Sequence, residues 1–133
     1  MINWSIFFRS ALSPLIIWGI MVGLVTLSGQ PGVVCITPMA WLLALWCGTN
    51  YIRLSGGQAG RRLLLGPALA GGLLGVGEGV IFAMGVGSSM PLSSPEDVFK
   101  AQLLTVVVIA AGIIICAGLS TFTAWLSLKR LAR

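Results

Sequence analysis

Four long apolar stretches, separated by short polar segments, dominate the pattern of residues along the chain. They cover residues of about 6–27, 33–53, 63–87 and 101–128. Each stretch is long enough to cross a hydrocarbon core of about 30 Å as a helix that rises about 1.5 Å per residue. The pattern therefore predicts an all-α integral membrane protein, with four transmembrane helices and short loops in one domain over residues 1–133.

Proline and capping residues indicate where these helices begin. Ser94, Pro95, Glu96 and Asp97 form the sequence of an N-cap serine, a first-turn proline and two acids that the helix dipole favours. We therefore expect the fourth helix to begin near Pro95, outside the bilayer. Pro14 leaves two alternatives open: a kink in one long first helix, or a short interfacial helix before the first span.

Composition supports the membrane assignment. The chain has 133 residues, of which 57% are hydrophobic and only 8% are charged, and its mean hydropathy is +1.02. A soluble domain carries about 25% charged residues, and a chain of this size cannot bury so much apolar surface within itself. These values argue against a soluble enzyme, a disordered tail and a nucleic-acid-binding module. A cleaved signal peptide, the alternative for the first stretch, lacks a small-residue cleavage motif at residues 28–30.

The distribution of charge predicts an orientation. The net charge is +5, and seven of the eight basic residues fall on one side of the predicted four-span topology, which places the N- and C-termini in the cytoplasm. We expect the cytoplasmic membrane of a bacterium, with lipids as partners and no nucleic acid. The basic residues expected to contact anionic lipid are Arg53, Arg61, Arg62, Lys129, Arg130 and Arg133. Arg9 shares their side, and Lys100 lies alone on the other.

Histidine and cysteine usage limits the chemistry. The chain has no histidine, which excludes imidazole ligands to haem or zinc and any histidine-based catalytic triad. Cys35, Cys47 and Cys116 form no C-x-x-C pair, and the last two lie within apolar stretches, as expected of small buried hydrophobic residues. We therefore expect no metal, no other cofactor and no catalytic activity.

Glu78 is the one acid deep inside a predicted span. An ionisable residue at this depth costs about 2.5–3.5 kcal/mol on insertion scales, so it usually faces protein or water. Gly71, Gly75 and Gly79 recur every four residues, a spacing that allows another helix backbone to approach closely. Glu78 lies about 20° around the helix from Gly71. The acid is therefore expected to border the glycine face and to point into a helix contact.

No basic residue occurs at a matching depth in another span. The hydrogen-bond donors expected near Glu78 by depth are Thr37, Trp41, Trp18 and Thr105. Three interpretations of Glu78 stay open: a neutral acid hydrogen-bonded across helices, a proton or cation site in transport, and a contact to another subunit.

Short loops and a glycine-lined helix favour a structural role. The sequence predicts a non-catalytic small membrane subunit or accessory protein of a larger complex, associating through its glycine-rich third helix. The alternative is a small homo-oligomeric transporter or channel in which Glu78 couples to a proton or cation. The sequence leaves open whether the glycine face packs within the chain or against another chain.

Overall fold

The computed structural model describes residues 4–27, 33–56, 64–89 and 93–131, and these ranges contain helices and no strand. The helices are α1 (Trp4–Leu27), α2 (Val33–Leu54), α3 (Leu65–Ser89) and α4 (Pro95–Leu131). The prediction of an all-α fold is confirmed for this part of the chain.

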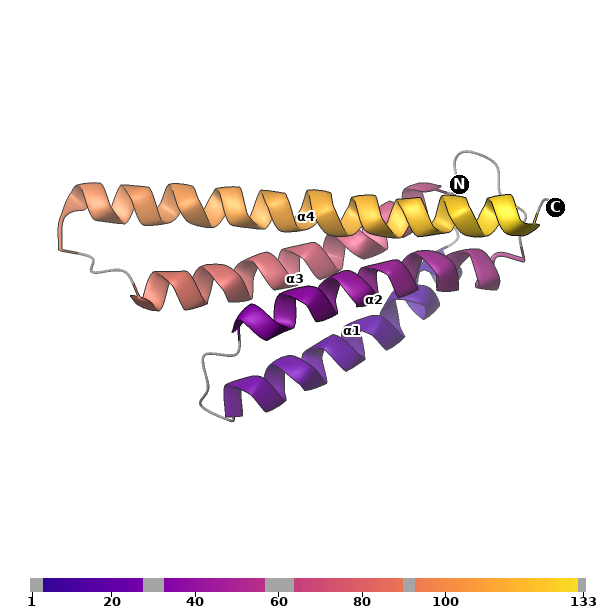
Figure 1. Ribbon diagram of the computed structural model, residues 1–133, viewed down its shortest axis with the longest axis horizontal. Coiled ribbons are helices and arrows are strands. Elements are labelled where there is room, and N and C mark those ends of the chain that lie inside the picture. The colour runs from indigo at the N-terminus through magenta and orange to yellow at the C-terminus, as the bar shows by residue number, and fades with distance from the viewer. Residues whose placement is uncertain (1–3, 28–32, 57–63, 90–92, 132–133) are drawn as a thin grey trace.

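The four helices run alternately up and down (Figure 1). α2 contacts every other helix, whereas α1 contacts α2 and α3. The helices converge at the end of the molecule where α1 begins and α4 ends, and they separate toward the opposite end (Figure 1). The beginning of α1 and the end of α4 thus share one end of the bundle.

Two proline positions resolve questions that the sequence raised. Pro14 lies inside α1, which is one continuous helix of 24 residues. α4 begins at Pro95, where the Asp97 amide donates to Ser94 Oγ at 3.2 Å and the Ser94 amide donates to Asp97 Oδ2 at 3.1 Å. This reciprocal pair is a capping box with aspartate as its acid, and it satisfies two backbone donors at the helix start.

Three helices in the described part of the chain are long and apolar enough to cross a membrane. They are Trp4–Leu27, Leu65–Gly85 and Pro95–Leu131. α2, the second of the four predicted spans, is not among these three, although its 22 residues give it a length of about 33 Å at ~1.5 Å per residue. α4, with 37 residues, extends for about 55 Å and so exceeds a hydrocarbon core of about 30 Å.

The buried core lies at the converging end of the bundle. The hydrophobic residues with less than 2% exposure are small for the most part: Ala40, Ala44, Cys47, Ile52, Ala70, Leu74, Cys116 and Ala124. Glu78 and Gly79 are the last buried residues along the described part of α3, whose side chains are more exposed from Val80 to Gly85. Glu78 therefore marks the edge of the core, where the helices begin to separate.

Candidate functional site

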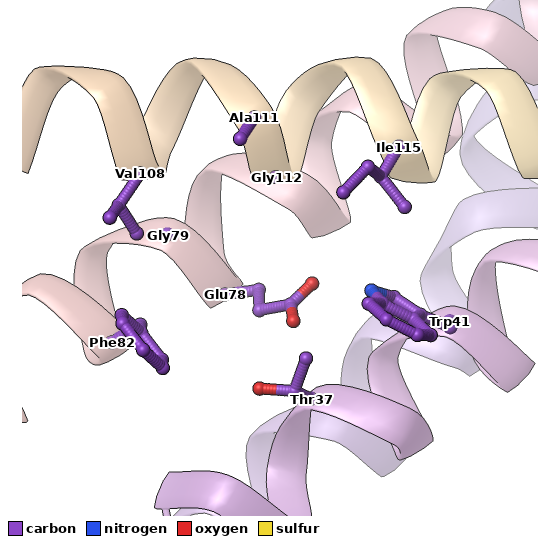
Figure 2. A pocket seen from close by; sticks show the side chains of 9 residues that line it. All are labelled: Thr37, Trp41, Glu78, Gly79, Phe82, Val108, Ala111, Gly112 and Ile115. Atoms are coloured by element: carbon purple, nitrogen blue, oxygen red, sulfur yellow. The ribbon is translucent and has the colours of Figure 1, made fainter.

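The Glu78 side chain projects from α3 into the space between α2 and α4 (Figure 2). Its residue is only 7% exposed. The thiol of Cys116 donates to Glu78 Oε2 across a distance of 3.4 Å, and the Thr37 side chain of α2 lies on the opposite side of the carboxyl (Figure 2). Three helices thus supply the groups that surround this acid.

A pocket of about 170 Å³ adjoins the Glu78 carboxyl. Its lining combines aliphatic and aromatic side chains with one hydroxyl and one carboxyl, so Glu78 is its sole ionisable residue (Figure 2). The lining residues are Thr37, Trp41, Glu78, Gly79, Phe82, Val108, Ala111, Gly112 and Ile115. Trp41 is 40% exposed and Ile115 is 41% exposed, so the pocket opens onto the outside of the bundle.

Two of the four donors expected near Glu78 line its pocket, and two lie elsewhere. Thr37 and Trp41, four residues apart on α2, line it together. Trp18 instead contacts α3 at Gly77, about 100° around the helix from Glu78. Thr105 donates to the carbonyl of Ala101 in its own helix, at 2.9 Å. The position of a residue along its helix therefore does not predict whether its side chain points toward Glu78, because that depends on how the helix is rotated about its axis.

Cys116 is a partner of Glu78 that the sequence did not reveal. The prediction that Cys47 and Cys116 are buried is confirmed, because both residues are fully enclosed and neither forms a disulfide. However, Cys116 also acts as a hydrogen-bond donor to the acid. The thiol is a weak donor, and only the register between α3 and α4 shows that it lies beside Glu78.

The glycine face of α3 packs against α4 of the same chain. A Cβ atom added to Gly71 would overlap the carbonyl oxygen of Cys116, and one added to Gly75 would overlap that of Gly112. At Gly79 the added atom would lie 2.6 Å from the Cα of Ile109. The backbone of α4 thus occupies the space that a side chain at these positions would need, a close approach that small residues permit between membrane helices. Within the described residues, the close approach that the glycine spacing predicted is therefore to α4.

A further glycine permits the contact between α2 and α4. A Cβ atom on Gly48 would overlap the carbonyl oxygen of Ser120 and the hydroxyl of Thr123. The same Thr123 hydroxyl donates to the carbonyl of Leu45 at 3.0 Å. Ala40, Ala44 and Gly48 recur every four residues on α2, so the spacing of small residues, and not of glycines alone, is the signal that indicates this contact.

Charged residues in the described ranges lie near the helix ends, apart from Glu78. Arg9, Arg53, Lys129 and Arg130 occur at the converging end of the bundle, whereas Lys100 pairs with Glu96 at 2.8 Å near the beginning of α4. Lys129 Nζ lies 5.4 Å from the centre of the Trp125 ring, an arrangement suited to a membrane interface. The predicted lipid contacts Arg61, Arg62 and Arg133 lie outside the described residues.

Asp97, in the first turn of α4, has a different environment from Glu78. Hydroxyl groups of Ser94 and Ser93 donate to Asp97 Oδ2 at 2.8 and 3.2 Å. These bonds hold the pKa of Asp97 below its ordinary value. In the described part of the chain, no three histidine, cysteine or acidic residues are placed to hold a metal ion.

The chain matches no family model, no curated protein and no solved structure in comparisons with each.

Proposed function

We propose that this chain is a small non-catalytic integral membrane protein that acts as a subunit or accessory protein of a larger membrane complex. In this proposal all four helices cross the cytoplasmic membrane of a bacterium, with both termini in the cytoplasm. The asymmetry of the basic residues supports this orientation, because four of the five described basic residues occur at the converging end of the bundle.

The observation that carries the proposal is the weak packing of the second half of α1. The four buried residues of this helix are Phe7, Ser10, Ala11 and Pro14, and all lie in its first half. Gly19 and Gly23 are four residues apart, and a Cβ atom on either would have no neighbour within 4 Å. Because α4 fills the glycine face of α3, we place the contact with a partner on α1 instead.

The proposed occupant of this part of α1 is a transmembrane helix of another polypeptide. Small residues four apart are typical of contacts between membrane helices, because they allow close backbone approach. An added Cβ atom at Gly19 or Gly23 has no neighbour within 4 Å in the described part of the chain, so a bulky residue there should block a partner and leave the fold of the chain intact.

Purification in mild detergent tests the proposal. Wild-type protein should bring down other polypeptides in a fixed ratio, and Gly19→Leu and Gly23→Leu should lose them. Gly118→Leu is the matched control, because Gly118 of α4 also has no neighbour within 4 Å of an added Cβ. Retention of the same partners by both α1 variants would contradict a contact through α1.

A second candidate function is favoured by the Glu78 pocket. A buried acid beside an open pocket suits a small homo-oligomeric transporter that couples to a proton or a cation. This candidate requires flux into liposomes that contain only this protein, with loss of the flux in Glu78→Gln. Glu96→Gln is the control, because Glu96 lies in an exposed ion pair near the beginning of α4. Unchanged flux in Glu78→Gln would contradict a coupling role for Glu78.

A further inference from the structure

The Glu78 pocket has a lining that selects for one class of ligand. Glu78 is a buried residue with 7% exposure, so its carboxylate needs compensation by a proton or by a positive charge, because an unpaired buried charge is very costly. None of the basic residues in the described ranges lines the pocket. A positive charge at this site would therefore come from a ligand.

The remaining lining disfavours a divalent metal ion such as calcium or magnesium. Calcium takes about six to eight oxygen ligands, and magnesium requires a nearly ideal octahedron. The pocket side chains offer the carboxyl of Glu78 and the hydroxyl of Thr37 as oxygen donors, and the rest of the lining is apolar or aromatic. A metal ion would lose much of its hydration here without replacement.

The aromatic side chains favour an organic cation. Trp41 and Phe82 line the pocket together with Glu78 (Figure 2), and aromatic rings attract quaternary ammonium groups through their π faces. The aliphatic side chains of Val108 and Ile115 suit the apolar part of such a ligand. The pocket has a volume of about 170 Å³, which suits a small ligand or the charged end of a larger one.

We propose that the Glu78 pocket binds a small hydrophobic organic cation, with its charged group against the Glu78 carboxylate and the rings of Trp41 and Phe82, and with its apolar body against Val108 and Ile115. The cation replaces the proton of Glu78, which is released as the ligand enters. The inference rests on the pocket alone, so it holds for a subunit and for a transporter.

The groups that face Glu78 permit this exchange. From α4 the facing titratable group is Cys116, and Cys47 of α2 lies near Cys116. α3 contributes no other titratable residue in its described part, and the one titratable residue of α1 is Arg9, in its second turn. Competition between the proton and the cation at Glu78 is therefore the expected origin of any dependence on pH.

Calorimetric titration of the purified chain in lipid nanodiscs with benzyltrimethylammonium tests the inference. We expect saturable binding below about 1 mM, weakened at least about tenfold in Glu78→Gln and roughly threefold to tenfold in Trp41→Leu. Glu96→Gln, at an exposed acid outside the pocket, should bind as the wild type does. Binding to the wild type should also weaken as the pH is lowered, a measurement that needs no variant.

Two results would overturn the inference: the absence of saturable binding to the wild type, or equal binding by wild type and a folded Glu78→Gln. If Glu78→Gln does not fold, the pH series on the wild type decides, and binding that does not respond to pH rejects the exchange. The ligand-binding tests are independent of the purification of partner polypeptides. Failure to bind the cation would therefore reject this inference without affecting the proposed function.

Discussion

Gly75 and Gly72 lie one turn apart on α3 but face different surroundings, so the same substitution should have opposite effects at the two positions. A Cβ atom on Gly75 would lie 2.5 Å from the carbonyl carbon of Gly112 and 2.7 Å from the Cα of Ile113. Carbon atoms pack best at about 3.5–4.0 Å, so α4 would have to move by about 1 Å. Both neighbouring atoms belong to the backbone, which cannot yield as a side chain does.

The expected cost of Gly75→Ala follows from this overlap. Overpacking of a core costs about 1–3 kcal/mol, and alanine returns about 0.5–1 kcal/mol by its greater helix propensity. The difference between these two terms is a net loss of up to about 2.5 kcal/mol in the free energy of unfolding. At Gly72 the nearest atom to an added Cβ is 3.8 Å away, so Gly72→Ala should be neutral or stabilising by up to about 1 kcal/mol.

Equilibrium unfolding of both variants by sodium dodecyl sulfate in mixed micelles, followed by circular dichroism, measures these differences. The comparison is internal to one helix, so effects of detergent apply equally to both variants. Equal stability of Gly75→Ala and the wild type, or equal destabilisation by Gly72→Ala, would refute the close contact between α3 and α4.

Other predictions concern the start of α4 and the buried thiols. Ser94→Ala should destabilise α4 by about 1 kcal/mol through loss of its cap, as hydrogen exchange in its first turn would reveal; unchanged exchange argues against the cap. Because the pKa of Asp97 is below its ordinary value of 3.8 in the fold, its contribution to stability is present above pH 3.8 and is lost as the pH falls through the lower folded value. Asp97→Asn should therefore remove this acid-dependent loss of stability in acid titrations. An unaltered dependence of stability on pH would contradict the lowered pKa of Asp97. In a Cys35→Ser background, maleimide should label Cys47 and Cys116 only after denaturation, because both are fully buried; rapid labelling of the native protein would contradict their enclosure.

The sequence predicted the helices well because their signals are local. Apolar runs of sufficient length and the Ser94–Asp97 capping sequence depend on neighbouring residues alone, and α4 begins at Pro95 as expected. The direction of Glu78 also followed from the periodicity of a single helix. Its residue is 7% exposed and borders Gly79 in the same pocket.

Contacts between helices were harder to predict because they depend on register and rotation. Nothing in the sequence pairs Gly75 with Gly112 or Gly71 with Cys116. In this antiparallel register the Cys116 thiol contacts the Glu78 carboxyl because both side chains lean toward the start of their own helix. Trp18 has a suitable depth, but α1 directs it to Gly77 instead of the pocket. The separation of the helices beyond Glu78 likewise results from packing in three dimensions.

The mass and composition of the assembly purified through a tag on this chain, measured by native mass spectrometry from mild detergent, test the proposed function most directly. We predict one or more other polypeptides in fixed stoichiometry, released by Gly19→Leu and retained by Gly118→Leu. A lone monomer, or an assembly that contains copies of this chain and nothing else, would contradict a role as a subunit of a larger complex.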